Sequence, residues 1–278
     1  MEAILVPVLI VSALGLIFGI VLAVSFIFFS VPTDERVEAL TEALPGANCG
    51  ACGFPACEGY AKAIAHEDAP TNACALGGAA VAMKLSEIMG VAFTDTVKEY
   101  AMVMCQGTCN VAPDKMDYQG VQTCAACNEY YRGKSSCSYG CLGLADCVKV
   151  CPYGAIKIVD GIAKVDADLC VGCKICTKAC PKGIIHMVPE TATVHVLCSS
   201  KDKGIVTKKA CSLGCIGCKK CEKTCSFGAI TVTDNCAHID YSKCTNCGDC
   251  VGQCPTGSIV HLLPDCFAEK ELIEVAEG

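Results

Sequence analysis

Tryptophan is absent from this chain of 278 residues, and aromatic residues make up only 6% of it. A core built mainly from large aromatic side chains is therefore excluded. The chain also lacks a basic excess, because 22 Lys and Arg stand against 29 Asp and Glu and give a formal net charge of −7. A surface that binds nucleic acid needs such an excess, so nucleic acid is not an expected partner.

Common catalytic and nucleotide-binding motifs are missing as well. The sequence contains no G-x-G-x-x-G fingerprint, no P-loop and no nucleophile elbow. Neither a flavin nor NAD is therefore expected on this chain, and no residue is singled out as catalytic.

Cysteine, in contrast, is abundant, with 28 residues or about one in ten. That density would indicate a disulfide scaffold in a short secreted protein, but this chain is long and shows no cleavable secretory signal. Metal clusters that take four thiolates each are the better interpretation. Their binding free energy also contributes to folding, which suits a chain with little material for a conventional core.

The segment 1–31 is predicted to be a transmembrane helix. No charged residue lies between Glu2 and Asp34, and about 20 apolar residues are enough to cross the core of a bilayer. A signal peptide is the alternative, but it would need a basic start, a shorter apolar run and a small-residue cleavage site. Because reduced thiols and iron-sulfur clusters belong in the cytoplasm, we expect a single pass through the cell (inner) membrane, contact with membrane lipid, and the cysteine-rich body on the cytoplasmic side.

Residues 32–90 are predicted to form a small domain with one four-cysteine site. A helix is expected to begin at Thr33 or Asp34 and to stop before Pro45-Gly46, and a second helix is expected over 79–89. Between them, the spacing C-x2-C-x4-C-x16-C is formed by Cys49, Cys52, Cys57 and Cys74. Such a set holds either zinc or a [4Fe–4S] cluster. We favour the cluster.

An internal repeat with an offset of 74 residues organises the remainder of the chain. The cysteine pairs in register are Cys124 and Cys198, Cys137 and Cys211, Cys141 and Cys215, Cys147 and Cys221, Cys151 and Cys225, Cys170 and Cys244, Cys173 and Cys247, Cys176 and Cys250, and Cys180 and Cys254. Two copies of one unit are therefore predicted over 121–190 and 191–265, after a connecting segment 91–120 and before a C-terminal tail 266–278.

Each unit contains two halves of a bacterial-type ferredoxin. CVGCKICTKACP from Cys170 and CTNCGDCVGQCP from Cys244 match the run C-x2-C-x2-C-x3-C-P, in which three cysteines share a cluster with the fourth cysteine of the other run. The segments between the runs predict β-hairpins with turns at Asp160-Gly161 and Asp234-Asn235. The pairing predicts clusters on Cys151, Cys170, Cys173 and Cys176, on Cys215, Cys218, Cys221 and Cys254, and on Cys225, Cys244, Cys247 and Cys250.

One cluster of the repeats is irregular, because Leu144 stands where the second copy has Cys218. The remaining ligands are Cys141, Cys147 and Cys180. We expect Cys137 to bend in as the fourth ligand. The alternative is a cluster with three cysteines and one open or non-cysteine corner.

Eight cysteines lie outside these five clusters. A sixth cluster is possible on the spacing C-x3-C-x14-C-x2-C, formed by Cys105, Cys109, Cys124 and Cys127. The repeat partner of Cys124 favours instead a role common to both units, such as that of a small buried apolar residue. Cys236 is interpreted as a core residue and Cys266 as an unliganded thiol, while Cys198 and Cys211 have no assigned role.

Seven lysines gather between positions 201 and 223, namely Lys201, Lys203, Lys208, Lys209, Lys219, Lys220 and Lys223. They could dock an acidic carrier such as a soluble ferredoxin and speed its encounter with this chain. A solvated face that offsets the anionic charge of nearby clusters is an equally open interpretation.

The order of transmembrane helix, NCGACGFPAC-x16-C motif and ferredoxin repeats resembles the B subunit of the Rnf complexes, the ion-translocating ferredoxin:NAD oxidoreductases. The resemblance covers nearly the whole chain. It implies a membrane complex in which this subunit takes electrons from reduced ferredoxin and passes them towards flavin- and NAD-binding subunits, while sodium ions or protons cross the membrane. Short members of the family have a single two-cluster domain, so the second copy is a departure.

The expected fold class is α+β, with one N-terminal transmembrane helix, a small four-cysteine [4Fe–4S] domain and two tandem bacterial-type 2[4Fe–4S] ferredoxin domains. A string of such clusters without a substrate motif is expected to relay single electrons. Two rivals remain. One is a catalytic iron-sulfur subunit that uses an open cluster corner beside Leu144, and the other is a structural zinc protein.

Overall fold

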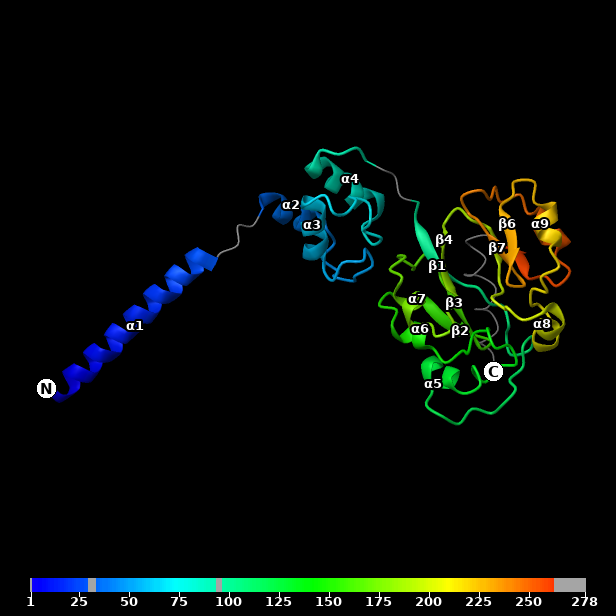
Figure 1. The fold of residues 1–278 in the computed structure, drawn as a ribbon, viewed down its shortest axis with the longest axis horizontal. Helices are drawn as coiled ribbons and strands as arrows, with labels where there is room; N and C mark the ends of the chain where they lie inside the picture. The colour runs from blue at the N-terminus through cyan, green and yellow to red at the C-terminus, as the bar shows by residue number, and fades with distance from the viewer. Residues whose placement is uncertain (1, 30–33, 94–96, 263–278) are drawn as a thin grey trace, which may run out of the picture.

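The structure is a computed structural model that describes residues 2–29, 34–93 and 97–262, with side chains of the first helix described at Ile10 and over 12–26. Figure 1 shows three parts along the chain: helix α1 at the N-terminus, a small helical domain, and a larger body of short strands and helices. The predictions for Cys266 and for the tail 266–278 lie outside the described residues.

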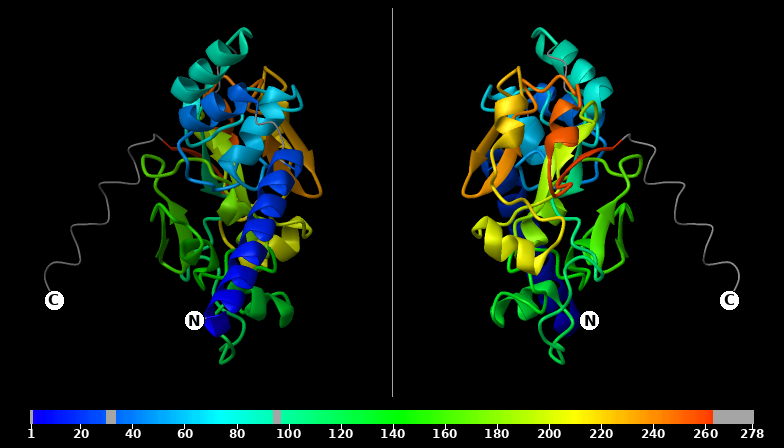
Figure 2. Two further views of the ribbon diagram at one scale, coloured as in Figure 1. Left: turned by 90° about the vertical axis from the view of Figure 1, so that its left-hand side faces the viewer. Right: turned by 90° about the vertical axis from the view of Figure 1, so that its right-hand side faces the viewer.

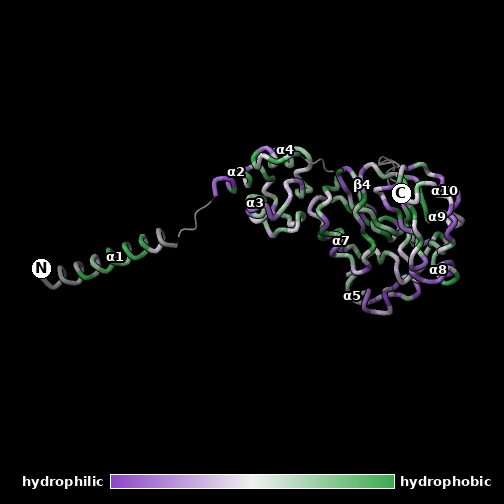
Figure 3. Tube along the Cα trace, turned by 45° about the horizontal axis from the view of Figure 1, so that its top comes forward, coloured by the Kyte–Doolittle hydropathy of each residue, from purple (hydrophilic) through white to green (hydrophobic). Residues whose placement is uncertain are grey.

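Helix α1 spans Glu2–Phe29, and Figure 3 shows that its coloured middle part is mainly apolar. Its described large side chains, among them Leu16, Phe18 and Leu22, are exposed. Within the part of the chain whose residues are described, no helix is both long and apolar enough to cross a membrane. The transmembrane helix predicted over 1–31 is therefore not confirmed.

The small domain packs three helices against one another. They are α2 Glu35–Ala43, α3 Cys57–Ala65 and α4 Gly78–Met89, which confirms both predicted helices. Asp34 caps α2 by accepting the backbone N–H of Arg36 at 2.9 Å, because the first N–H groups of a helix have no partner inside it. Leu40, Tyr60 and Leu85 are fully buried between the helices.

The body consists of two units built from short elements. The first contains β1 Glu99–Val103, α5 Cys124–Glu129, α6 Asp146–Lys149, β2 Ile156–Val159, β3 Ile162–Val165, α7 Ile175–Ala179 and β4 Ile185–Pro189. The second contains β5 Val194–Val196, α8 Gly204–Ala210, α9 Lys220–Thr224, β6 Ile230–Thr233, β7 Cys236–Ile239, α10 Asp249–Gln253 and β8 Ile259–His261. Figure 2 shows the hairpins β2–β3 and β6–β7 on opposite flanks of the body.

Both predicted hairpins are confirmed. β2 pairs antiparallel with β3, and β6 pairs antiparallel with β7. The turn residues all have positive φ: 50° at Asp160, 79° at Gly161, 49° at Asp234 and 62° at Asn235. Two consecutive residues of positive φ match the twist of the flanking strands, which is why Asp, Asn and Gly occur in these turns.

Residues 91–120, predicted to be a connecting segment, instead contribute a strand to the first unit. β1 pairs antiparallel with β4, the last strand of that unit. β5 holds the same place in the second unit, beside β8. The first unit therefore begins at β1, before the predicted boundary at 121.

The strand pairing also changes which cysteines are equivalent. Cys105 lies two residues after β1, and Cys198 lies two residues after β5. Cys105 is therefore the structural counterpart of Cys198, a place that the 74-residue offset gave to Cys124. Between Cys105 and Cys137 the first unit carries an inserted segment, which contains α5.

The variant Tyr60→Phe is expected to loosen the small domain. The buried Tyr60 hydroxyl donates to the carbonyl oxygen of Pro70 at 2.6 Å and accepts the N–H of Ala73 at 2.9 Å. Phenylalanine would leave both backbone groups unpaired, at a cost of about 1–3 kcal/mol. Amide hydrogen exchange in α3 of the metal-loaded protein, followed by mass spectrometry, should accelerate roughly tenfold. Tyr131→Phe, at a residue that is 82% exposed, is the control, and equal exchange in the two variants would contradict the expectation.

Candidate iron-sulfur sites

The small domain brings its four predicted ligands together beside α3. Cys74 lies close enough to the other three cysteines, Cys49, Cys52 and Cys57, for their charges to interact. The Sγ atom of Cys74 also accepts the backbone N–H of Gly77 at 3.3 Å. A hydrogen bond of this kind stabilises the charge of a thiolate.

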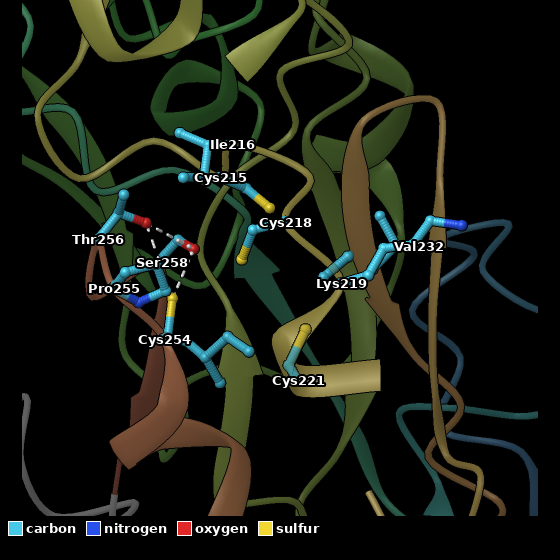
Figure 4. Close-up of a pocket in the computed structure, with 12 residues that line it drawn as sticks. Cys215, Ile216, Cys218, Lys219, Cys221, Val232, Cys254, Pro255, Thr256 and Ser258 are labelled. Atoms are coloured by element: carbon cyan, nitrogen blue, oxygen red, sulfur yellow. Dashed lines mark hydrogen bonds between the residues drawn. The ribbon is translucent and has the colours of Figure 1, made fainter. Parts of the chain in front are cut away.

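In the second unit, four sulfur atoms face a common cavity (Figure 4). They belong to the predicted set Cys215, Cys218, Cys221 and Cys254. The Sγ atom of Cys254 lies 3.2 Å from Ser258 Oγ and 3.7 Å from Thr256 Oγ1. Both hydroxyl groups can therefore donate hydrogen bonds to this sulfur when it is a thiolate.

The two regular sets that remain are also brought together. One cavity of the second unit is lined by Cys225, Cys244, Cys247 and Cys250. In the first unit, Cys173 and Cys176 lie within electrostatic reach of Cys151 and Cys170. In both units the fourth cysteine of one run thus joins the first three of the next, which is the crossed arrangement of bacterial ferredoxins.

The cavity of the irregular set in the first unit is lined by Cys124 and not by Cys137. The other cysteines that line it are Cys141, Cys147 and Cys180. The backbone N–H of Leu144 donates to the Cys124 sulfur, so that sulfur lies beside the residue that replaces Cys218 of the second unit. Since a fourth thiol lines this cavity, the alternative of an open corner loses its support.

The inserted segment holds Cys124 in place. Cys124 is the first residue of α5, and the next residue, Ala125, donates its N–H to the Asp146 carboxylate at 3.0 Å. Lys149 Nζ donates to the carbonyl oxygen of Gln122 at 3.4 Å. Both contacts tie the start of α5 to α6, the helix that carries another cysteine of the same set.

Cys137 lies in a different cavity, between the two units. The other cysteines that line it are Cys105, Cys198 and Cys211. A signal for this placement exists in the sequence, because Cys137 has a repeat partner in the copy whose cluster motif is already complete. Cys137 and its repeat partner Cys211 must therefore share a role that does not depend on Leu144.

The possible sixth set of Cys105, Cys109, Cys124 and Cys127 is not assembled. Cys105 and Cys124 line separate cavities. Cys109 is exposed, and Cys127 is buried in α5. The sequence spacing failed here because α5 turns back onto α6 and carries Cys124 away from Cys105.

Burial makes most of these thiols weaker acids. It raises the pKa of Cys147 to about 12 and the pKa values of Cys176 and Cys221 to about 11. Cys215 is an exception, because a hydrogen bond from the buried Cys236 thiol lowers its pKa to about 5. Iron binds the thiolate form, so cluster assembly must release protons from the buried sets.

The donors gathered at these sites are cysteine sulfurs. Over the described ranges, no group of three or more His, Cys, Asp or Glu is spaced to hold one metal ion. The cysteines of three sets line a cavity, as a ligand of several atoms requires. Four thiolates are the usual ligands of a [4Fe–4S] cluster.

The variant Cys124→Ala is expected to lose about four irons per chain, the content of one [4Fe–4S] cluster. Adding Leu144→Cys should restore them, because that substitution recreates the regular run of the second unit. Iron and acid-labile sulfide on anaerobically purified protein measure both effects. Cys127→Ala removes a buried cysteine from the same helix and should leave the iron content unchanged. Full iron content in Cys124→Ala would contradict the assignment.

Comparison with known proteins agrees with these sites. A family described as a putative Fe-S cluster matches residues 44–75, and a 4Fe-4S dicluster domain matches residues 136–184 and again 214–258. The chain thus contains 4Fe-4S cluster domains in an α+β fold.

Curated relatives match almost the full length of the chain. It is 46% identical to the B subunit of the Na(+)-translocating ferredoxin:NAD(+) oxidoreductase complex of Acetobacterium woodii, over 93% of this chain and 78% of that protein. It is 40% identical to the B subunit of the ion-translocating oxidoreductase complex of Methanosarcina acetivorans, over 90% and 95%. It is 42% identical to the B subunit of the proton-translocating ferredoxin:NAD(+) oxidoreductase complex of Clostridium ljungdahlii, over 93% of each. The chain therefore belongs to the family of B subunits of the Rnf-type ion-translocating oxidoreductase complexes.

Proposed function

We propose that this chain is the electron-relay subunit of a membrane-bound, ion-translocating ferredoxin:NAD oxidoreductase. It accepts electrons from reduced ferredoxin, passes them to partner subunits and converts no substrate of its own. Two of its relatives are named for ferredoxin and NAD, one with sodium and one with proton translocation. A [4Fe–4S] cluster accepts and releases one electron at a time, which is the chemistry that a relay needs.

The observation that carries this proposal is that neighbouring cysteine sets lie side by side. Cys49 of the small domain is within electrostatic reach of Cys173 in the first unit. Cys147 is within the same reach of Cys176, which belongs to the other set of that unit. In the second unit, Cys221 of α9 and the helix-capping Cys225 belong to different sets and are one helical turn apart. The sets of each unit are thus adjacent, as electron transfer between them requires.

The lysine-rich end of the second unit supports docking of an acidic carrier. Cys218 is exposed there, and Lys219 lines the same cavity as Cys218. Two of the seven lysines form ion pairs: Lys201 with Asp234 at 3.8 Å and Lys219 with Glu222 at 3.9 Å. The lysines without an ion-pair partner among the described residues are Lys203, Lys208, Lys209, Lys220 and Lys223.

An apolar patch lies among these lysines. Ile205 on α8 is 77% exposed, and Val206 beside it is half exposed. An apolar centre with charged surroundings is the usual composition of a transient docking surface. We infer that reduced ferredoxin binds here and delivers its electron to the set that contains Cys218.

The triple variant Lys203→Glu, Lys220→Glu and Lys223→Glu tests this docking surface. The rate constant for reduction by ferredoxin should fall at least tenfold at low salt, because electrostatic attraction becomes repulsion. The difference should shrink as salt screens the charges. Stopped-flow absorbance of the clusters measures both effects. The matched control, Lys84→Glu, Lys157→Glu and Lys178→Glu, changes the net charge equally at exposed sites outside the surface. Equal rates in the two variants would refute the docking surface.

We also propose that α1 anchors the subunit in the cell membrane, with the cysteine-rich body in the cytoplasm. The segment between Glu2 and Asp34 carries no charge. About 20 consecutive apolar residues are enough to cross the core of a bilayer, so the anchor is proposed from the sequence. Cluster ligands also need the reducing cytoplasm to stay as thiols.

The variant Leu16→Arg with Ile20→Arg tests the anchor in the full-length chain expressed without partner subunits. Each arginine at the centre of a membrane helix costs about 2.5–3.5 kcal/mol on insertion. The protein should move from the alkali-washed membrane pellet to the soluble fraction, as a western blot would show. Leu16→Val with Ile20→Val should remain in the pellet. Retention of the arginine variant in the pellet would disprove the anchor.

A further inference from the structure

We propose that Cys105, Cys137, Cys198 and Cys211 hold a sixth [4Fe–4S] cluster between the two ferredoxin units. Cys105 and Cys137 come from the first unit, and Cys198 and Cys211 come from the second. Neither unit alone contains the complete set, which we call the interface site. The role of the interface site in electron transfer rests on the proposed relay function. The placement of its four cysteines does not depend on that function.

The four sulfurs surround one small volume. A Cβ atom added to Gly107 would lie 3.6 Å from the Sγ of Cys105 and 3.8 Å from the Sγ of Cys211. Cys137 lies within electrostatic reach of Cys105 and of Cys198, and Cys211 lies within the same reach of Cys137 and Cys198. Glycine at position 107 keeps the space between the sulfurs free of a side chain.

Two sulfurs of the interface site, one from each unit, accept backbone N–H groups. The donors are Gly107 and Cys141 for Cys105, and Ser200 and Cys215 for Cys198. The donor-to-sulfur distances range from 3.2 to 3.5 Å at Cys105 and Cys198. Such bonds stabilise the negative charge of ligand thiolates and adjust the potential of the cluster that they hold.

The donors repeat between the units just as the cysteines do. One donor on each side is itself a cysteine of the neighbouring set, and these two, Cys141 and Cys215, are 74 positions apart. The remaining donors, at 107 and 200, each lie two residues after their cysteine. The two halves of the interface site are therefore equivalent, as expected where two copies of one unit meet. Chance packing of leftover thiols would not reproduce the same donors on both sides.

The interface site also connects the two units. Cys141, a member of the irregular set, donates its N–H to the Cys105 sulfur at 3.4 Å. Cys215, a member of the set in Figure 4, donates its N–H to the Cys198 sulfur at 3.2 Å. Each neighbouring set is thus one hydrogen bond away. With the interface site, six sets form a single row from the small domain to the set that contains Cys225, and the set that contains Cys218 is next to last.

Iron and acid-labile sulfide content test the site on anaerobically purified full-length protein. Wild type should contain about 24 irons and Cys137→Ala and Cys211→Ala about 20 each, since one [4Fe–4S] cluster holds four. Both variants should lose the electron paramagnetic resonance signal of one cluster after dithionite reduction. Cys127→Ala, which removes a buried cysteine outside every set, should keep the wild-type values.

Four outcomes are decisive. Wild-type iron content in both variants would overturn the interface site, as would about 20 irons in wild type together with four fewer free thiols, the mark of two disulfides. If a variant loses helical circular dichroism and most of its iron, the wild-type count alone decides between about 24 and about 20 irons. Iron counting does not involve ferredoxin. A loss of four irons with ferredoxin reduction of all remaining clusters unchanged would therefore keep the site and reject its place in the relay.

Discussion

Four cysteine side chains must come together at each site, and the remainder of the structure is arranged around that requirement. Large aromatic side chains contribute little to this chain, and cysteines such as Cys147, Cys176 and Cys221 are themselves part of the buried cores. Short helices and tight hairpins return the chain to each cavity within a few residues. The free energy of cluster binding then contributes directly to folding, and the protein conformation that carries electrons is the one that the clusters stabilise.

One inserted segment explains the two departures of the first unit from the second. It supplies Cys124 to the cavity of the set in which Leu144 replaces a cysteine. Cys137 instead lines the cavity between the units, opposite its repeat partner Cys211. The hydrogen bond from Ala125 to Asp146 fixes this arrangement. With Cys124 as ligand, the irregular set would keep four cysteines while Cys137 takes part in the contact between the units.

Local signals in the sequence predicted much of this fold. The cap at Asp34, the turn residues of both hairpins and the spacing of the ferredoxin runs each depend on neighbouring residues, and the structure places them as expected. Which distant cysteines meet depends on tertiary folding. The offset of 74 residues paired Cys124 with Cys198, whereas strand pairing equates Cys105 with Cys198. No local pattern shows that α5 turns back onto α6, so the ligand beside Leu144 and the interface site could not be predicted from spacing.

The central claim is that an electron entering at the lysine-rich end can reach every cluster of the chain. The most direct measurement compares the clusters reduced by excess reduced ferredoxin with those reduced by dithionite, by quantitative electron paramagnetic resonance on wild-type protein frozen within a second of mixing. A continuous row predicts that ferredoxin reduces the same clusters, with the same number of spins per chain, as dithionite does. Reduction by ferredoxin confined to the second unit, with the clusters of the first unit and the small domain still oxidised, would contradict it.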